Sequence, residues 1–298
     1  MNGPILVFGA AGQLGHEVIA LARARDIEAT GCHRARADIT DFDSVKAAIL
    51  AVKPRLVLNA AAYTAVDRAE TEPEAAYAAN AVGAKTVARA AALQQVPVIQ
   101  ISTDYVFDGT NKVAYVETDP IAPLGVYGKT KAAGEIMVRQ AHPRHFILRT
   151  AWVYGRFGAN FLKTVLRLSR ERAELRIVAD QRGCPTATQD LAEAVFAIDR
   201  ALARGIVVPG TYHFAGSGVT TWHGFASAIV EAQAQATGRR PKISAIATAD
   251  YPTLARRPAN SELDSSLFAS VFGYRARDWQ TRARETVEML LEETRAET

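Results

Sequence analysis

The first half of the chain alternates short apolar runs with longer helical patterns, and this alternation constrains the fold more than any other feature. Two of the longer segments, residues 12–25 and the alanine-rich residues 72–95, carry apolar residues at helical spacing. The apolar runs have the length and composition of strands and are ILVFG (5–9), IEATGC (27–32), RLVLNAA (55–61), VPVIQIS (96–102) and HFILRTA (145–151). Strands that alternate with helices indicate βαβ units, so we expect an α/β fold with a doubly wound parallel sheet.

The second half of the chain has a looser pattern, which predicts a smaller lobe. After residue 155 come helices, two short apolar runs, LRIV and TYHFAG, and several proline-containing loops. We expect the chain to return to the first domain before completing the lobe. The expected dinucleotide-binding domain comprises residues 1–155 and 186–218, and the expected lobe comprises residues 156–185 and 219–298.

Composition and charge exclude several classes of protein. A chain of 298 residues with 49% hydrophobic content fills a sizeable core. It begins with an apolar strand and no basic leader, and no apolar run approaches the roughly 18 residues of a membrane span, so we expect a soluble, cytoplasmic protein. Its 35 basic and 31 acidic residues are interspersed, which suits an anionic small ligand and gives no nucleic-acid surface. Cys32 and Cys184 are far apart and indicate neither a disulfide framework nor a zinc site.

A glycine-rich turn follows the first expected strand. The segment FGAAGQLG carries Gly9, Gly12 and Gly15 and opens the first helix. Glycines at such a turn let the backbone approach a pyrophosphate, and the helix N-terminus faces the negative charge of that group. An ordinary tight turn would have the same composition. Its position between a strand and a helix at the start of a βαβ chain favours a Rossmann-like nucleotide site.

The end of the second expected strand gives information on the cofactor. A site specific for NAD usually has an acidic residue here, but the segment reads GCHRARAD. Arg34 or Arg36 is able to bind a 2′-phosphate with its planar fork of donors, so we expect NADPH, with NADH as the alternative. Asp38 comes later and, with Ile39, is expected near the adenine end.

The third and fourth expected strands end in residues suited to a ligand site. Ala62, Tyr63 and Thr64 follow the third strand, where small residues leave room for a cofactor, although an ordinary loop remains an alternative. The fourth strand ends ISTDYVFDG, which places Thr103 and Asp104 at the same edge of the sheet.

A tyrosine and a lysine, Tyr127 and Lys131, lie at positions i and i+4 of the segment VYGKTKAAGE. On a helix such residues share a face about 6 Å apart. A nearby cation favours phenolate, so we expect Lys131 to lower the pKa of Tyr127 towards the range of a general acid or base. A surface pair would show the same spacing. The glycine turn and the hydroxyl of Thr103 in the same chain favour a catalytic pair.

Longer stretches of the chain resemble one enzyme family. The chain resembles the dTDP-4-dehydrorhamnose reductases, which are extended short-chain dehydrogenases/reductases, over essentially its whole length. The matching motifs keep the family's order and spacing and are NAAAYTAVDRAE, STDYVFDG, YGKTKAAGE, RTAWVYG, NFLKTVL, DQRGCPT, YHFAGSGVTTW and YPTLARRPANSELD. Motifs in the second lobe are the specific ones, because the whole superfamily shares the glycine turn and the Tyr-Lys pair.

The resemblance implies roles for matched residues. It implies a catalytic triad of Thr103, Tyr127 and Lys131, and a lobe that binds a nucleotide sugar. Asp104 and Trp152 would hold the deoxysugar with Thr103, and Arg256 and Asn260 would contact the diphosphate or nucleotide. The full set of expected cofactor-binding positions is Gly9, Gly12, Gln13, Leu14, Gly15, Arg34, Asp38, Ile39, Ala62, Tyr63, Thr64, Tyr127 and Lys131.

One departure from the family concerns magnesium. Some members bridge a dimer through acidic residues and magnesium, with one acid in the helix after CPT. Here Gln189 stands near that position, although Glu17 remains in the first helix. We therefore assign no metal ligand and expect either a monomer or a homodimer.

The resemblance implies reduction of dTDP-4-dehydro-L-rhamnose to dTDP-L-rhamnose, a step in nucleotide-sugar and cell-surface polysaccharide biosynthesis. Two alternatives remain open. One is an epimerase that uses the same tyrosine and lysine and retains NAD⁺, which the arginine-rich end of the second strand disfavours. The other is a non-catalytic regulatory subunit of a methionine adenosyltransferase. The expected partners are small molecules, with no nucleic acid and no membrane.

Overall fold

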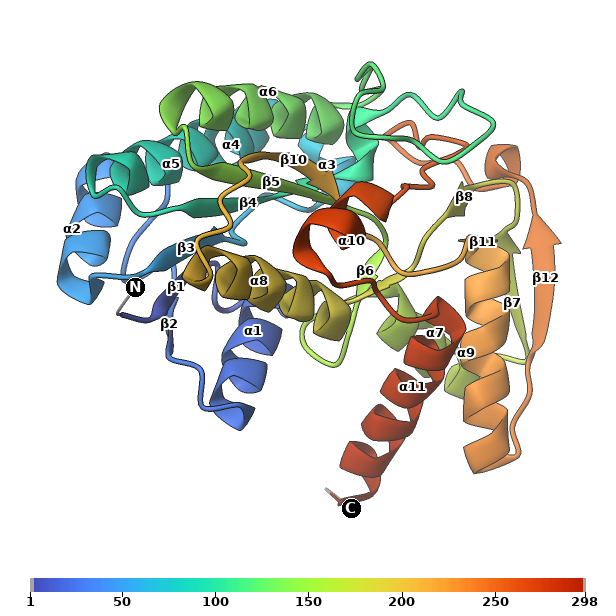
Figure 1. The fold of residues 1–298 in the computed structure, drawn as a ribbon. Coiled ribbons are helices and arrows are strands. Elements are labelled where there is room, and N and C mark those ends of the chain that lie inside the picture. The colour runs from blue at the N-terminus through green and yellow to red at the C-terminus, as the bar shows by residue number, and fades with distance from the viewer. Residues whose placement is uncertain (1–2, 297–298) are drawn as a thin grey trace.

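A six-stranded parallel sheet forms the centre of the computed structural model, which describes residues 3–296 (Figure 1). Its order is β10-β5-β4-β3-β1-β2, and each neighbouring pair is parallel. The chain therefore leaves β1 towards β2 on one side and then returns to place β3 on the other. Ligands of such sheets bind outside the carboxyl ends of the strands at this reversal point. The strands are β1 (Ile5–Phe8), β2 (Ala29–Cys32), β3 (Leu56–Asn59), β4 (Val98–Thr103), β5 (His145–Thr150) and β10 (Gly210–His213).

Both faces of this sheet are buried, which explains the unbroken apolar runs in the sequence. In β1, Ile5 and Val7 belong to one hydrophobic cluster, whereas Leu6 and Phe8 belong to the other. Helices α1, α8 and α10 pack on the first face, and α2, α5 and α6 pack on the second (Figure 1). The expected doubly wound α/β fold is confirmed. These helices are α1 (Gln13–Ala24), α2 (Phe42–Val52), α5 (Ala84–Leu93), α6 (Val126–Ala141), α8 (Thr188–Ala203) and α10 (Ser266–Phe272).

The segment 72–95, expected as one helix, consists of three pieces. Helix α4 (Pro73–Tyr77) is followed by a π-helical stretch, Ala78–Gly83, and then by α5. The wider turn carries Asn80, which is buried, and its side chain bonds the backbone N–H and C=O of Tyr63 at 2.9 and 3.1 Å. Periodicity alone does not reveal such a turn, because the apolar residues keep nearly the same spacing.

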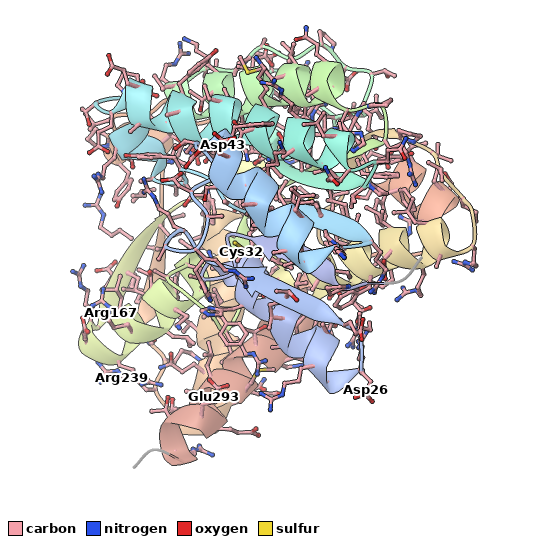
Figure 2. All side chains as sticks on the ribbon, turned by 90° about the vertical axis from the view of Figure 1, so that its left-hand side faces the viewer. Asp26, Cys32, Asp43, Arg167, Arg239 and Glu293 are labelled. Atoms are coloured by element: carbon pink, nitrogen blue, oxygen red, sulfur yellow. The ribbon has the colours of Figure 1, made fainter. Side chains whose placement is uncertain are left out.

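The smaller lobe has its own apolar core. Phe225 is fully buried there and packs on Tyr154, Phe161 and Trp279. Charged residues such as Arg239 lie on the outside of the lobe (Figure 2). Its elements are β6 (Val153–Tyr154), α7 (Phe161–Glu171), β7 (Glu174–Val178), β8 (Arg182–Gly183), β9 (Thr186–Ala187), β11 (Thr220–Thr221), α9 (Trp222–Thr237), β12 (Lys242–Ile246) and α11 (Trp279–Ala296).

The two expected short strands of the second half lie in different places. Strand β7 pairs with β12 inside the lobe, whereas β10 extends the main sheet beside β5. The remaining helix, α3 (Val66–Ala69), is short and follows β3. None of the helices in residues 3–296 combines the length and apolar character needed to cross a membrane.

Candidate active site

The three expected catalytic residues converge from β4 and α6. Thr103 is the last residue of β4, and Tyr127 and Lys131 lie on the first turns of α6. The backbone N–H of Val126 at the start of α6 donates to the Glu70 carboxylate at 2.8 Å, which caps the helix from outside. The helix packs closely on the turn that follows β4, because a Cβ on Gly128 would collide with the Tyr105 carbonyl oxygen.

Tyr127 lies in an environment that favours its protonated form. Burial of the phenol and the negative charge of Asp104 raise the pKa of Tyr127 to about 12, and contact with the Thr103 side chain offsets this only in part. The expected lowering of this pKa by Lys131 is therefore wrong for this structure. The ammonium group of Lys131 instead donates to the Ile101 carbonyl oxygen at 2.6 Å. At neutral pH Tyr127 keeps its proton and is available as a proton donor.

Lys131 is almost fully buried, with 4% of its surface exposed. Burial lowers the pKa of Lys131 to about 8, while the negative charge of Glu135, one turn further along α6, raises it. The ammonium form therefore still predominates at pH 7. A cation held beneath the tyrosine would stabilise a phenolate formed during a reaction.

Glu135 anchors α6 to the sheet and was missed by sequence reasoning. Its carboxylate accepts hydrogen bonds from Ser102 at 2.6 Å and from two nitrogens of Arg149 at 2.9 and 2.8 Å. Arg139 adds a further bond at 2.8 Å. The signal in the sequence was its position two turns after Tyr127 on the same helix face. Ile101 and Ser102 of β4 thus contact Lys131 and Glu135 respectively, which sets the helix in register with the strand.

Asp104 is a buried acid next to the reacting hydroxyl groups. Its Oδ1 accepts a hydrogen bond from Thr103 at 2.9 Å, whereas its Oδ2 is buried without a hydrogen-bond partner among residues 3–296. Burial raises the pKa of Asp104 to about 7, although hydrogen bonds from neighbouring hydroxyls counteract the shift. An orphaned buried oxygen of this kind is suited to a ligand hydroxyl.

A cavity of about 370 Å³ lies at the reversal point of the sheet. At its base Gly9 has φ +77°, and a Cβ there would collide with the backbone of Ala61, so only glycine fits. The cavity contains Gly9, Arg34, Asp38, Ile39, Ala62 and Tyr63 of the expected cofactor set. The complete lining is Gly9, Arg34, Ala37, Asp38, Ile39, Thr40, Ala61, Ala62, Tyr63, Ala75, Ala78 and Ala79.

Four of the expected cofactor positions lie at the start of α1, outside the cavity lining, and Tyr127 and Lys131 lie on α6. Gly12 precedes α1 and Gln13 begins it, followed by Leu14 and Gly15. A Cβ on Gly15 would collide with the Gly9 carbonyl oxygen, so the turn needs both glycines. Thr64 is exposed and outside the lining, as is Arg36. The glycine turn, the helix N-terminus and the adjoining cavity fit a dinucleotide with its pyrophosphate at α1.

Arg34 and Asp38 form an ion pair at this cavity. Arg34 Nε donates to Asp38 Oδ2 at 2.9 Å, and the Arg34 side chain is 88% exposed. The other carboxylate oxygen accepts from the backbone and hydroxyl of Thr40 at 3.0 and 2.8 Å. Bonds from Thr40 and Arg34 hold the pKa of Asp38 below its usual value. The cavity thus offers an exposed cation for a phosphate and a carboxylate for hydroxyl groups.

A second cavity, of about 480 Å³, is lined mainly by residues of the smaller lobe. Tyr105 lines it and packs edge-on against Tyr127, with ring centroids 5.9 Å apart. Arginines and aromatic rings together suit an anionic ligand with a flat group. The lining is Tyr105, Phe161, Thr164, Val165, Leu168, Arg172, Leu175, Arg176, Ile177, Val178, Gln181, Trp222, Tyr251, Thr253 and Arg257.

Trp152 lies beside this cavity in an unusual backbone conformation. Its φ is +46°, which is uncommon for a bulky residue and is often found at functional sites. Its ring stacks on Trp222, a lining residue, with centroids 3.6 Å apart. A Cβ on Gly183 would collide with the Trp152 ring, so the indole is tightly enclosed.

The structure separates Arg256 and Asn260 from the cavity. Arg256 is exposed and does not line it, whereas its neighbour Arg257 does. The Asn260 amide nitrogen donates to the carbonyl oxygens of Asn111 and Val113 at 2.9 and 3.0 Å, so its donors are already used within the protein.

The residues around Glu17 do not fit a magnesium site. Glu17 accepts a hydrogen bond from Thr188 at 2.8 Å, and its other oxygen lies 3.9 Å from Arg156. Gln189 and Asp190 both accept bonds from Arg282. Within residues 3–296 no three His, Cys, Asp or Glu side chains are grouped so as to hold a metal ion. The positive charges beside these side chains belong to Arg156 and Arg282.

The chain is similar to known enzymes over nearly its whole length. The family model described as "RmlD substrate binding domain" matches residues 1–292. A dTDP-4-dehydrorhamnose reductase of Sinorhizobium fredii is 43% identical over 289 residues, covering 96% of this chain and 97% of that protein. The enzyme of the same name from Escherichia coli K12 is 40% identical and covers 97% of this chain and 99% of its own.

Solved structures agree with the sequence comparison. A dTDP-4-dehydrorhamnose reductase from Clostridium acetobutylicum has a TM-score of 0.89 at 36% identity, with 97% of this chain and 99% of that chain covered. One from Bacillus anthracis in complex with NADP has a TM-score of 0.87 at 33% identity, with 98% and 100% covered. A Thermus thermophilus UDP-glucose 4-epimerase with NAD has a TM-score of 0.78 at 21% identity over 97% and 99%, which shows a shared fold alone.

Proposed function

The chain belongs to the family of dTDP-4-dehydrorhamnose reductases, and we propose that it reduces the 4-keto group of dTDP-4-dehydro-L-rhamnose to give dTDP-L-rhamnose. This is a step in nucleotide-sugar and cell-surface polysaccharide biosynthesis. The observation that carries the proposal is the position of Tyr127, whose ring packs on Tyr105 in the wall of the arginine-lined cavity. A sugar held at that end of the cavity meets a protonated phenol, and the nucleotide extends into the smaller lobe.

The protein's contribution to the reaction is positioning and proton transfer. NADPH supplies a hydride for the sugar C4. Tyr127 donates its proton to O4, so that the carbonyl becomes a hydroxyl, and Lys131 stabilises the phenolate left behind. The Thr103 hydroxyl, which donates to Asp104 in this structure, would turn to donate to the carbonyl oxygen and align it with Tyr127. These roles are supported by the raised pKa of Tyr127 and by the buried, charged Lys131 one turn further along α6.

The deoxysugar is expected against Asp104 and Trp152. The buried Oδ2 of Asp104 lacks a partner and is suited to accept from a sugar hydroxyl. One face of the Trp152 ring is already stacked on Trp222, so contact of Trp152 with the sugar stays an expectation from the sequence. For the diphosphate, the cavity lining favours Arg257 over the expected Arg256 and leaves no free donor on Asn260.

We propose NADPH as the preferred cofactor and NADH as a second one. The Bacillus anthracis relative was solved in complex with NADP. In this chain the exposed Arg34 lines the cofactor cavity and is suited to a 2′-phosphate. Asp38, its ion-pair partner, is suited to ribose hydroxyls when that phosphate is absent.

We further propose the domain division expected from the sequence and a location in the cytoplasm, as a monomer or homodimer with small molecules as partners. The division is supported by the separate apolar core around Phe225 and by the pairing of β10 with β5, whereas β6, β9 and α10 pack across the expected bounds.

The test is the fall in absorbance at 340 nm when NADPH and dTDP-4-dehydro-L-rhamnose are added to the purified protein. We expect Tyr127→Phe to lower kcat by about 10²- to 10⁴-fold, because a positioned proton donor contributes this much. NADPH binding by the variant, followed by fluorescence, should be retained. Activity near that of the wild type in Tyr127→Phe would refute the role of this residue.

The alternatives predict different results in the same assay. An epimerase would interconvert nucleotide sugars without net oxidation of NADPH. A regulatory subunit would co-purify with a methionine adenosyltransferase and show no turnover. Absence of NADPH oxidation by folded protein would therefore reject the reductase proposal and direct attention to these two.

A further inference from the structure

Two neighbouring arginines, Arg256 and Arg257, occupy very different positions. Arg256 is exposed and outside the large cavity, whereas Arg257 lines it and is partly buried. Of the two arginines in the stretch RRP, Arg257 therefore contributes its guanidinium to the cavity wall and Arg256 does not. We propose that Asp67 is a positioning residue, which fixes the guanidinium of Arg257 to receive the diphosphate of the substrate. This inference rests on the proposed function.

Asp67 holds Arg257 through both of its oxygens. Arg257 donates to Oδ2 at 2.9 Å and to Oδ1 at 3.2 Å, which is the paired geometry typical of strong arginine-carboxylate contacts. The backbone N–H of Ala255 also donates to Oδ1, at 3.1 Å. The hydrogen bond from Arg257 lowers the pKa of Asp67, so the carboxylate stays charged at neutral pH. Asp67 thus fixes both the side chain and the loop that carries it.

The fixed guanidinium lies close to the reacting residue. Arg257 contacts Tyr105, and the Tyr105 ring packs on Tyr127. A substrate whose C4 carbonyl meets Tyr127 and whose nucleotide occupies the aromatic part of the cavity has its diphosphate in between. Arg257, which lines the cavity and contacts Tyr105 beside Tyr127, is therefore expected to meet the diphosphate.

A carboxylate partner matters because a free arginine side chain is mobile. Ordering it on binding costs rotamer entropy. The loop bearing Arg257 exposes Tyr251 and Leu254 and needs an anchor of its own. Asp67 orders the Arg257 side chain and its loop before the ligand arrives. This lowers the entropy cost of binding, so the ligand binds more tightly. The guanidinium has five N–H donors, so donors remain for a phosphate after Asp67 is bound.

The test is calorimetric titration of the full-length protein with dTDP and, separately, with thymidine, which lacks the phosphates. Arg257→Ala should weaken dTDP binding by about 10- to 100-fold, as expected for a lost bond to a charged group, and leave thymidine binding unchanged. Arg256→Ala is the matched control and should leave both unchanged. NADPH binding should be unchanged in every variant.

Asp67 is tested in the same way. Asp67→Asn should weaken dTDP binding by about ten-fold without affecting thymidine, because the arginine remains but is no longer held. Asp67→Glu keeps the charge and should recover most of the affinity. In turnover, Asp67→Asn should raise KM for the nucleotide sugar and leave kcat almost unchanged, a split that a general loss of folding would not produce.

Several results would overturn the inference. It fails if Arg256→Ala and Arg257→Ala weaken dTDP binding equally, if the wild type does not bind dTDP, or if Asp67→Asn leaves dTDP affinity unchanged. It also fails if Asp67→Asn weakens dTDP, thymidine and NADPH together, since that is the effect of a structural ion pair. The expected binding pattern without NADPH oxidation by the wild type would support the diphosphate site and reject the proposed reaction.

Discussion

Burial controls the titration of the catalytic side chains at the residue scale. Tyr127 and Asp104 both have raised pKa values, whereas that of Lys131 is lowered, and in all three the main cause is loss of water. The directions of these three pKa shifts suit proton transfer at neutral pH. At neutral pH the tyrosine holds a proton, the lysine still holds its charge, and the buried acid is close to its titration point.

Asp104 should make the protein less stable as the pH rises. Its pKa is about 7 in the folded protein against a usual value of 3.8, so its contribution is full below about pH 4 and is lost as the pH rises through 7. Asp104→Asn does not titrate. Between pH 5 and 8 the unfolding free energy of the wild type should fall relative to that of Asp104→Asn by on the order of 2–3 kcal/mol.

Denaturant titrations at several pH values measure this difference, and Asp108→Asn is the control. Bonds from Thr110 lower the pKa of Asp108, so its stabilisation is lost only as the pH falls below about 4. Its difference from the wild type should therefore be constant between pH 5 and 8. An equally constant difference for Asp104→Asn would show that Asp104 is not desolvated as described.

At the element scale, the position of α6 depends on charged groups at both ends of its catalytic face. Glu70 caps its first turn and Glu135 joins it to β4 and β5. Glu135 is buried, and its partner Arg149 is only 2% exposed. Because neither charge reaches water, each depends on the other.

Glu135→Gln should therefore destabilise the protein strongly. The amide leaves Arg149 buried without a counter-charge, which costs about 3–5 kcal/mol of unfolding free energy. Glu262→Gln is the control, because its partner Arg182 is half exposed and such pairs contribute about 0–1 kcal/mol. Equilibrium denaturation compares the two variants. Equal losses would contradict the importance assigned to burial.

The sequence predicted these elements better than it predicted their contacts. The strands were visible because both faces of the sheet are apolar, and the Tyr127 and Lys131 pair because helical spacing is local. The partnership of Glu135 with Arg149 joins a helix to the next strand, so no local pattern reveals it. Arg256 and Arg257 differ only in side-chain direction within an irregular loop, which a sequence does not encode in any simple way.

The same limit applies to the pKa of Tyr127. The spacing of Tyr127 and Lys131 predicted a nearby cation and hence a lower pKa. Burial and the charge of Asp104 act in the opposite direction, and both depend on how distant segments pack. The identities of the site residues were therefore easier to predict from the sequence than their pKa values.

At the scale of the whole molecule, the large cavity and the glycine turn adjoin different apolar cores. The core around Phe225 supports Phe161 and Trp222, which line the large cavity. The core that contains Phe196 of α8 also contains Leu14, which lies within the glycine turn between Gly12 and Gly15. If the proposed division into two domains is correct, damage to one core should affect one ligand more than the other.

Two matched substitutions test this division. Phe225 and Phe196 are 0% and 1% exposed, and replacing either with alanine should cost about 3–5 kcal/mol of unfolding free energy. Phe225→Ala should weaken dTDP binding and retain NADPH binding, because the cavity walls lose support while the glycine turn does not. Phe196→Ala should do the reverse. Calorimetric titration at low temperature, where both variants remain folded, measures the four affinities. Equal loss of both ligands in both variants would contradict the division, because it would mean that the two cores respond as one cooperative unit.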